Sequence, residues 1–195
     1  MYRLIIGISF LALILPNHLR AQEVESILKA PDDWNSELIE FPLSFAPQID
    51  FEGIEDIRFS PGWSNPYSEQ FWTYYFCWYV AGETELTDDF LERTMNLYFD
   101  GLIAVVINNQ EDSIRVEEVG QTSSTFSRAQ EGFEGEISIF DAFFTMEEVR
   151  LRVKVRQDIC KAQGMQLISF ELSPKDFETP VWDLFKEIER LVPCN

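Results

Sequence analysis

Apolar and aromatic residues are most concentrated in residues 71–80, a stretch without charge, glycine or proline. Aromatic residues fit the pleated surface of a packed sheet, so this stretch predicts a central β-strand. With a period of two, one face carries Trp72 to Val80 at even positions, and the other carries the hydroxyl groups of Thr73, Tyr75 and Tyr79. Because both faces are apolar, we expect other parts of the chain to cover each of them.

Shorter apolar segments predict further strands on both sides of this one. We expect them at residues 38–45, 49–51, 54–59, 114–119, 133–144, 149–156 and 166–172. Pro42 suits an edge or a bulge in the first of them, and residues 133–144 and 149–156 are expected to form a hairpin.

Two segments have helical periodicity. Thr87 suits an N-cap, followed by Asp88 and Asp89 in the first turn, where the helix dipole favours negative charge. We expect this helix to continue through the apolar run 102–107, and a second helix to begin at Thr179 and Pro180. The prediction is a single α+β domain with an antiparallel sheet of about six to seven strands, covered by two main helices.

The chain begins with the pattern of a secretory signal peptide. Arg3 precedes an apolar run at residues 4–15, which is short for a membrane span, and Ala21 is the expected cleavage position. The mature protein would comprise residues 22–195, with no membrane span, and would be periplasmic or secreted.

The charge of the chain narrows the range of partners. The formal net charge is −19, from 15 basic and 34 acidic residues. Such a charge repels phosphate backbones and anionic lipids, so nucleic acid is not an expected partner.

Three cysteines are present, and an exported protein can form a disulfide. Cys77 lies within the aromatic strand, where a thiol behaves as a small apolar side chain. We therefore predict that Cys160 pairs with Cys194 and that Cys77 remains free.

The sequence excludes much catalytic chemistry. The only histidine is His18, within the predicted signal peptide, so the mature chain has no histidine for a catalytic triad or a zinc motif. No glycine-rich phosphate loop is present, and no cofactor is predicted.

Asp141 is the candidate catalytic carboxylate. It lies between Phe140 and Ala142, where the alternation of the hairpin changes parity, and a bulge there would redirect side chains. A buried carboxyl group could act as an acid or base. The alternative is an aspartate that caps the bulge or pairs with an arginine.

A row of cations alternates with apolar residues over residues 149–156, and it begins with Arg150 and Arg152. An anionic ligand such as an acidic sugar could bind there, together with the Thr73, Tyr75 and Tyr79 face. Such rows also pair with acids on neighbouring strands. We further expect that the helix after Thr87 covers the hydroxyl-bearing face and leaves no pocket there.

Two acidic clusters could attract calcium, one at residues 50–56 and one at residues 108–112. Neither matches the twelve-residue calcium loop, so no metal site is predicted.

Several segments resemble a family of short exported bacterial proteins with no assigned activity. They include residues 45–47, 52–63, 98–102, 140–143 and 180–182 in addition to the aromatic strand. The resemblance implies export and one compact domain. Because the mature chain lacks histidine and catalytic motifs and is rich in core aromatic residues, we expect a non-enzymatic exported protein with a ligand-binding, partner-binding or envelope role. The alternative is a carboxylate-based hydrolase acting on glycans.

Overall fold

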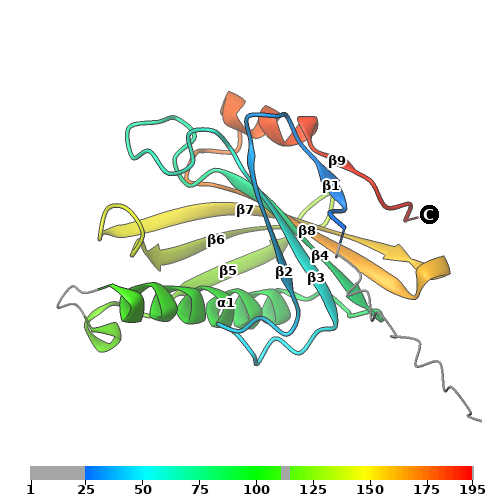
Figure 1. The fold of residues 1–195 in the computed structure, drawn as a ribbon, viewed down its shortest axis with the longest axis horizontal. Helices are drawn as coiled ribbons and strands as arrows, with labels where there is room; N and C mark the ends of the chain where they lie inside the picture. Colours follow the sequence, from blue (N-terminus) through cyan, green and yellow to red (C-terminus); the bar gives the residue numbers. More distant parts are fainter. Residues whose placement is uncertain (1–24, 111–114, 195) are drawn as a thin grey trace, which may run out of the picture.

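The computed structural model describes residues 25–110 and 115–194 as an α+β arrangement (Figure 1). Its main element is a seven-stranded antiparallel sheet in the order β2-β3-β4-β8-β7-β6-β5. The strands are β2 (Asn35–Glu40), β3 (Gly53–Phe59), β4 (Tyr74–Ala81), β5 (Ser123–Arg128), β6 (Phe133–Phe140), β7 (Glu148–Cys160) and β8 (Met165–Ser173). The predicted signal peptide lies outside the described residues.

The chain builds the sheet as two antiparallel meanders. Strands β2, β3 and β4 form the first, and the helix α1 (Asp88–Asn109) then leads to the far edge, where β5 begins the second. The second meander returns through β6 and β7 to β8, which pairs with β4. The aromatic strand is therefore central, as its composition predicts, with β3 on one side and β8 on the other.

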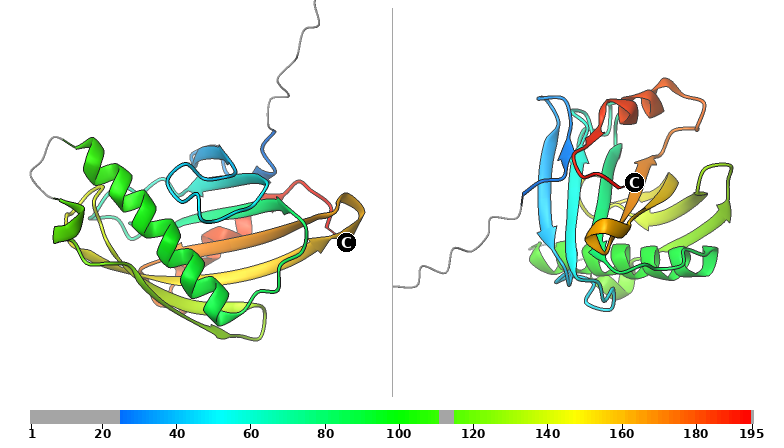
Figure 2. Two further views of the ribbon diagram at one scale, coloured as in Figure 1. Left: turned by 90° about the horizontal axis from the view of Figure 1, so that it is seen from below. Right: turned by 90° about the vertical axis from the view of Figure 1, so that its right-hand side faces the viewer.

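Helix α1 runs obliquely across one face of the sheet (Figure 2). Thr87 is its N-cap, and the Thr87 hydroxyl accepts a hydrogen bond from Phe90 N at 3.1 Å. Gly101 lies inside the helix, where a Cβ atom would approach the carbonyl oxygen of Phe45 to 1.9 Å, so only glycine lets the chain cross this closely. The core between helix and sheet includes Phe76, Trp78, Leu91, Met95, Phe99, Leu151, Val153, Val155 and Phe170.

The opposite face of the sheet is covered by the first and last parts of the described chain (Figure 1). We call residues 174–194 the C-terminal strap. It contains the 3-10 helix η3 (Pro180–Glu187) and the short strand β9 (Glu189–Arg190), which pairs with β1 (Leu28–Lys29). Trp182 and Phe185 of the strap pack with Tyr75, Cys77 and Leu167 of the sheet.

A buried ion pair attaches β1 to the sheet. Asp56 and Arg58 of β3 form this pair, and Asp56 Oδ2 accepts hydrogen bonds from Ile27 N at 2.8 Å and Leu28 N at 3.1 Å. Arg58 donates to the carbonyl oxygen of Leu28 at 2.6 Å. The charged groups of Asp56 and Arg58 are thus hydrogen-bonded to each other and to the backbone of residues 27–28, as buried charges require.

A disulfide joins Cys160, at the end of β7, to Cys194 at the end of the strap, and Cys77 is free and buried. This pairing confirms the prediction. No helix in residues 25–110 or 115–194 is long and apolar enough to cross a membrane.

Several predicted strand boundaries are wrong. The aromatic strand begins at Tyr74, because residues 68–73 form consecutive turns and Trp72 has a left-handed backbone (φ 52°). The segment predicted as a strand at 114–119 is a 3-10 helix, η1 (Val116–Glu118), in its described part. Residues 49–51 form no strand, and β2 ends before Pro42.

The prediction that α1 covers the face with Thr73, Tyr75 and Tyr79 is also wrong. In the register of β4, Phe76 and Trp78 face the helix, and the hydroxyl-bearing residues face the strap. The second covering element is the strap with its 3-10 helix, rather than a second α-helix.

Candidate functional site

The register of the sheet brings the hydroxyl-bearing face and the cationic row to the same side. Tyr75 lies opposite Glu171 of β8, and Glu171 lies opposite Lys154 of β7. One step further along, Ser169 of β8 lies opposite Arg156. Since side chains of paired residues point to the same face, the two features that the sequence suggested as ligand-binding form one surface.

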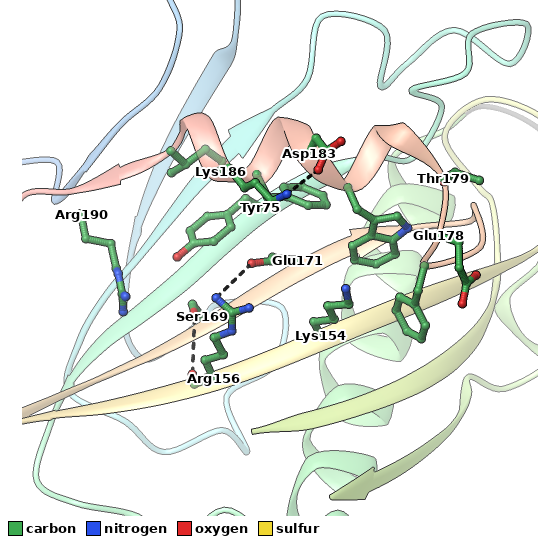
Figure 3. A pocket seen from close by; sticks show the side chains of 14 residues that line it. Tyr75, Lys154, Arg156, Ser169, Glu171, Glu178, Thr179, Asp183, Lys186 and Arg190 are labelled. Carbon is green, nitrogen blue, oxygen red and sulfur yellow. Dashed lines mark hydrogen bonds and ion pairs between the residues drawn. The ribbon is translucent and has the colours of Figure 1, made fainter. Parts of the chain in front are cut away.

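A pocket of about 370 Å³ lies between this surface and the strap (Figure 3). The sheet contributes Tyr75, Lys154, Arg156, Ser169 and Glu171. The strap contributes Phe177, Glu178, Thr179, Trp182, Asp183, Phe185, Lys186, Ile188 and Arg190. The volume is in the range of a pocket for a small molecule.

Lys154 has an aromatic environment in this pocket. Its Nζ atom lies 4.9 Å from the ring centres of both Phe177 and Trp182. Trp182 is held in place by a hydrogen bond from its Nε1 to the carbonyl oxygen of Lys175 at 3.3 Å. Cation–π attraction therefore fixes a charged group beside the aromatic wall.

The other cations of the pocket have carboxylate neighbours. Arg156 lies 4.0 Å from Glu171 and 3.3 Å from Glu131, and Arg190 pairs with Asp158. Lys186 pairs with Asp183 at 2.5 Å on the strap. These pairs position the cations, and the exposed ones can exchange a carboxylate for a ligand at little cost.

Burial also changes the ionisation of the pocket. It raises the pKa of Glu171, although Arg156 and Lys154 oppose the shift, and it raises the pKa of Tyr75. Burial thus opposes the charged form of Glu171, whereas the two neighbouring cations favour it.

Of the five residues predicted to bind a ligand, only Tyr75 lines this pocket. Thr73 is buried, with its hydroxyl 2.9 Å from that of Ser173, and Tyr79 packs at the edge of the apolar cluster beneath the strap. Arg152 donates to the carbonyl oxygen of Pro174 at 3.2 Å and pairs with Asp176 at 2.5 Å, so it anchors the start of the strap. Arg150 is exposed and lines a different pocket.

Asp141 is buried in the tight connection between β6 and β7. Its Oδ1 accepts hydrogen bonds from Phe143 N at 3.0 Å and Phe144 N at 3.1 Å. Its Oδ2 accepts from Thr145 N at 3.0 Å and from the Thr145 hydroxyl at 2.8 Å. Asp141 does not line the pocket beneath the strap, and its geometry is that of a turn cap, the alternative that the sequence left open.

Removal of the Asp141 carboxylate is expected to destabilise the protein. An Asp141→Ala variant would leave four partly buried donors without this acceptor, at a cost of about 2–4 kcal/mol in the free energy of unfolding. Urea unfolding of this variant beside Glu147→Ala, an exposed change in the same turn, would measure the difference. Equal stability of the two variants would contradict the capping role.

Glu55 is a second buried carboxylate, and it lies in the core beneath α1. Trp78 Nε1 donates to its Oε1 at 3.1 Å, whereas its Oε2 has no hydrogen-bond partner among the described residues. Burial raises the pKa of Glu55 to about 8, and the hydrogen bond from Trp78 only partly offsets the shift. The side chain is therefore mainly neutral at pH 7.

The acidic cluster at residues 50–56 is divided by the sheet. Glu55 faces α1, whereas Asp56, its neighbour on β3, faces the other side and binds Arg58. The second cluster, at 108–112, lies partly outside the described residues. Within residues 25–110 and 115–194, no three potential ligands gather as a metal site would require.

The sequence did not single out most of the pocket. Lys154 and Arg156 belong to the alternating row that begins at Arg150, so the sequence alone predicts that they share one face of the strand. Trp182 and Arg190 come from the strap, and no local pattern indicates that this segment returns over the polar face.

Comparisons with known proteins found no family model, no curated protein and no solved structure that matches this chain. The fold and the site define an α+β protein with a cation-lined pocket between its sheet and its C-terminal strap. The resemblance to short exported bacterial proteins stays a prediction, and functional inference depends on the geometry of the pocket.

Proposed function

We propose that this protein is an exported, non-enzymatic ligand-binding protein, a single domain over residues 22–195, that takes a small anionic sugar in the pocket beneath the strap. The observation that carries the proposal is the gathering of four cations, Lys154, Arg156, Lys186 and Arg190, in one pocket of a chain with a net charge of −19. Export is supported by the disulfide, which is typical of proteins in oxidising compartments.

The charges of the pocket favour an anion. Three carboxylates line the pocket beside the four cations, namely Glu171, Glu178 and Asp183. Asp183 pairs with Lys186, and Glu171 lies 4.0 Å from Arg156. Among the described residues, no carboxylate forms an ion pair with Lys154, which is held by aromatic rings instead. An entering carboxylate would find in Lys154 and Arg156 two charged hydrogen-bond donors on one strand.

The aromatic residues favour a ligand with a ring. Tyr75, Phe177 and Trp182 line the same pocket as the cations, and apolar ring faces next to polar groups suit the alternating surfaces of a sugar. Ser169 and Thr179 provide hydroxyl groups for further hydrogen bonds.

A carboxylate-based hydrolase has less support. Asp141 uses both carboxylate oxygens to hold its own turn, and it lies outside the pocket. Sugar turnover that disappears in an Asp141→Asn variant with native stability would restore this alternative.

Binding of glucuronate to the mature protein, measured by calorimetry at low salt, tests the proposal. We expect glucuronate to bind and neutral glucose to bind at least about tenfold more weakly, because only the acid engages the cations. Arg156→Ala should weaken glucuronate binding by about tenfold. Arg150→Ala removes the same charge from the same strand outside the pocket and should have little effect.

Two results would overturn the proposal. One is that glucuronate and related sugar acids do not bind to the wild-type protein. The other is that Arg150→Ala and Arg156→Ala reduce affinity equally, which would indicate unspecific attraction by surface charge.

A further inference from the structure

Strand β7 is longer than the strand that pairs with it at one edge. Its pairing with β6 ends at Val155, opposite Phe133, whereas its pairing with β8 continues to Cys160. Residues 156–160 therefore have a neighbouring strand on one side only. On the other side the sheet has an internal open edge, directly beyond the end of β6.

The backbone of two residues points to this open side. A Cβ atom on Gly132 would lie 2.0 Å from the carbonyl oxygen of Val155, so Val155 directs its carbonyl toward β6. Alternate residues of an antiparallel strand direct their N–H and C=O groups to the same neighbour, so Gln157 and Ile159 point the same way. No side chain or loop of the described residues hydrogen-bonds to these four groups.

A groove of about 940 Å³ runs along this edge, and we call it the edge groove. The loop 83–86 forms one wall, because Gln157 Nε2 donates to the carbonyl oxygen of Thr84 at 2.7 Å. Arg156, Asp158 and Arg190 form the other wall. The β5–β6 connection closes one end, so the groove occupies the space that a continued β6 would fill.

The outer edge of the sheet at β5 is treated differently. Phe126 N donates to Glu92 Oε1 at 3.1 Å, and Thr122 N donates to Asp100 Oδ1 at 2.7 Å. Side chains of α1 thus satisfy two N–H groups at this edge, and covering an edge with a helix is a known way to prevent unwanted strand pairing. The edge at Gln157 and Ile159 lacks such a cover.

We infer that the edge groove binds an extended, basic peptide segment of a partner protein, which adds as a strand beside residues 156–160 of β7. Strand addition uses the unpaired backbone groups for affinity and the two walls for selection of side chains. This inference does not require the proposed sugar site, although the two cavities share Arg156 and Arg190.

The charge of the groove favours a basic peptide. Glu131 and Asp158 are paired with Arg156 and Arg190, and the guanidinium of Arg128 lies 4.4 Å from the ring centre of Phe133. Glu83 and Glu85 are exposed and form no ion pair among the described residues. These two carboxylates outnumber Arg128, which lines the groove without an ion pair among the described residues, and the net charge of −19 attracts cations over longer distances.

Amide hydrogen exchange, followed by NMR on the mature protein, tests the inference at single residues. In the free protein, the amides of Gln157 and Ile159 should exchange fast and those of Arg156 and Asp158 slowly, because only the latter face β8. The added reagents are six-residue peptides in which valine and threonine alternate with lysine, or with glutamate. We expect the lysine peptides to slow exchange at Gln157 and Ile159 and the glutamate peptides to have no effect.

Two controls separate strand addition from simple charge attraction. A lysine peptide N-methylated at alternate residues keeps its charge but cannot complete the ladder, so it should not protect these amides. The Glu83→Lys, Glu85→Lys double variant should bind the lysine peptide at least about fivefold more weakly. A single Glu147→Lys change, at the opposite end of β7, should leave the affinity within about twofold.

Four outcomes would overturn the inference. The amides of Gln157 and Ile159 could already exchange slowly in the free protein; no lysine peptide could protect them at millimolar concentration; or the N-methylated peptide could bind equally well. Protection that grows with protein concentration alone would instead identify a second copy of this chain as the occupant.

Discussion

The Glu55→Gln variant is expected to be more stable than the wild-type protein at pH 9 and about equally stable at pH 5. The reason is the position of Glu55 in the core, where burial raises its pKa from 4.5 to about 8. Between these two values, unfolding releases a proton, so the free energy of unfolding falls as the pH rises. Below pH 4.5 the contribution is fully present, and above about pH 8 it is lost.

The expected size of this effect is roughly 4–5 kcal/mol, since each pKa unit corresponds to about 1.4 kcal/mol. Urea unfolding at each pH unit from 5 to 9 would measure it as a difference in slope between wild type and variant. Glu40→Gln, an exposed change on β2, should keep the wild-type slope. Parallel curves for Glu55→Gln and the wild type would show that Glu55 ionises normally.

Loss of the disulfide is expected to lower the free energy of unfolding by about 3–4 kcal/mol in the Cys160→Ser, Cys194→Ser double variant. The two cysteines are separated by 34 positions, and a loop of this length has a large entropy in the unfolded chain. Urea unfolding of the double variant, of the wild type and of the reduced wild type would give the values. The reduced wild type should match the variant.

The same change should loosen the strap before the sheet. The strap is joined to the N-terminal segment by few hydrogen bonds, among them Leu191 N to the carbonyl oxygen of Ile27 at 2.8 Å. We expect faster exchange at Leu191 in the double variant, with unchanged exchange in β4 and β8. Uniform acceleration across all strands would mean that the strap and the sheet open as one unit.

The central strand was predictable because its composition is decisive at short range. Residues 74–80 are aromatic or apolar throughout, and five of the seven are aromatic. The start of α1 was also predictable from neighbouring residues, since the Thr87 side chain caps the helix by accepting a hydrogen bond from Phe90 N. In both cases the residues that specify the structure are neighbours in the chain.

Strand β5 could not be predicted from its sequence. Its residues, Ser123–Arg128, are mainly small and polar, with Phe126 as the buried apolar side chain. The strand exists because β6 pairs on one side, while on the other Glu92 accepts a hydrogen bond from Phe126 N and Asp100 accepts one from Thr122 N, directly before the strand. Tertiary contacts of this kind override local propensity.

The sequence also could not predict which face of the central strand α1 covers. Both faces of the central strand are apolar, so alternation alone cannot say which of them meets the helix. The pocket depends on this choice, because the strap closes over the face that α1 leaves free. The cationic row could be predicted from the sequence. Arg190, Trp182 and the other strap residues lie beside it only because the end of the chain folds back over this face of the sheet.

Arg156 and Arg190 line both the pocket beneath the strap and the edge groove. An occupant of either cavity would therefore act on side chains that the other occupant also contacts. By thermodynamic linkage, each would change the affinity of the other by the same factor. An anion that draws Arg156 and Arg190 from Glu131 and Asp158 would leave those carboxylates free for a basic peptide, so the coupling should be positive.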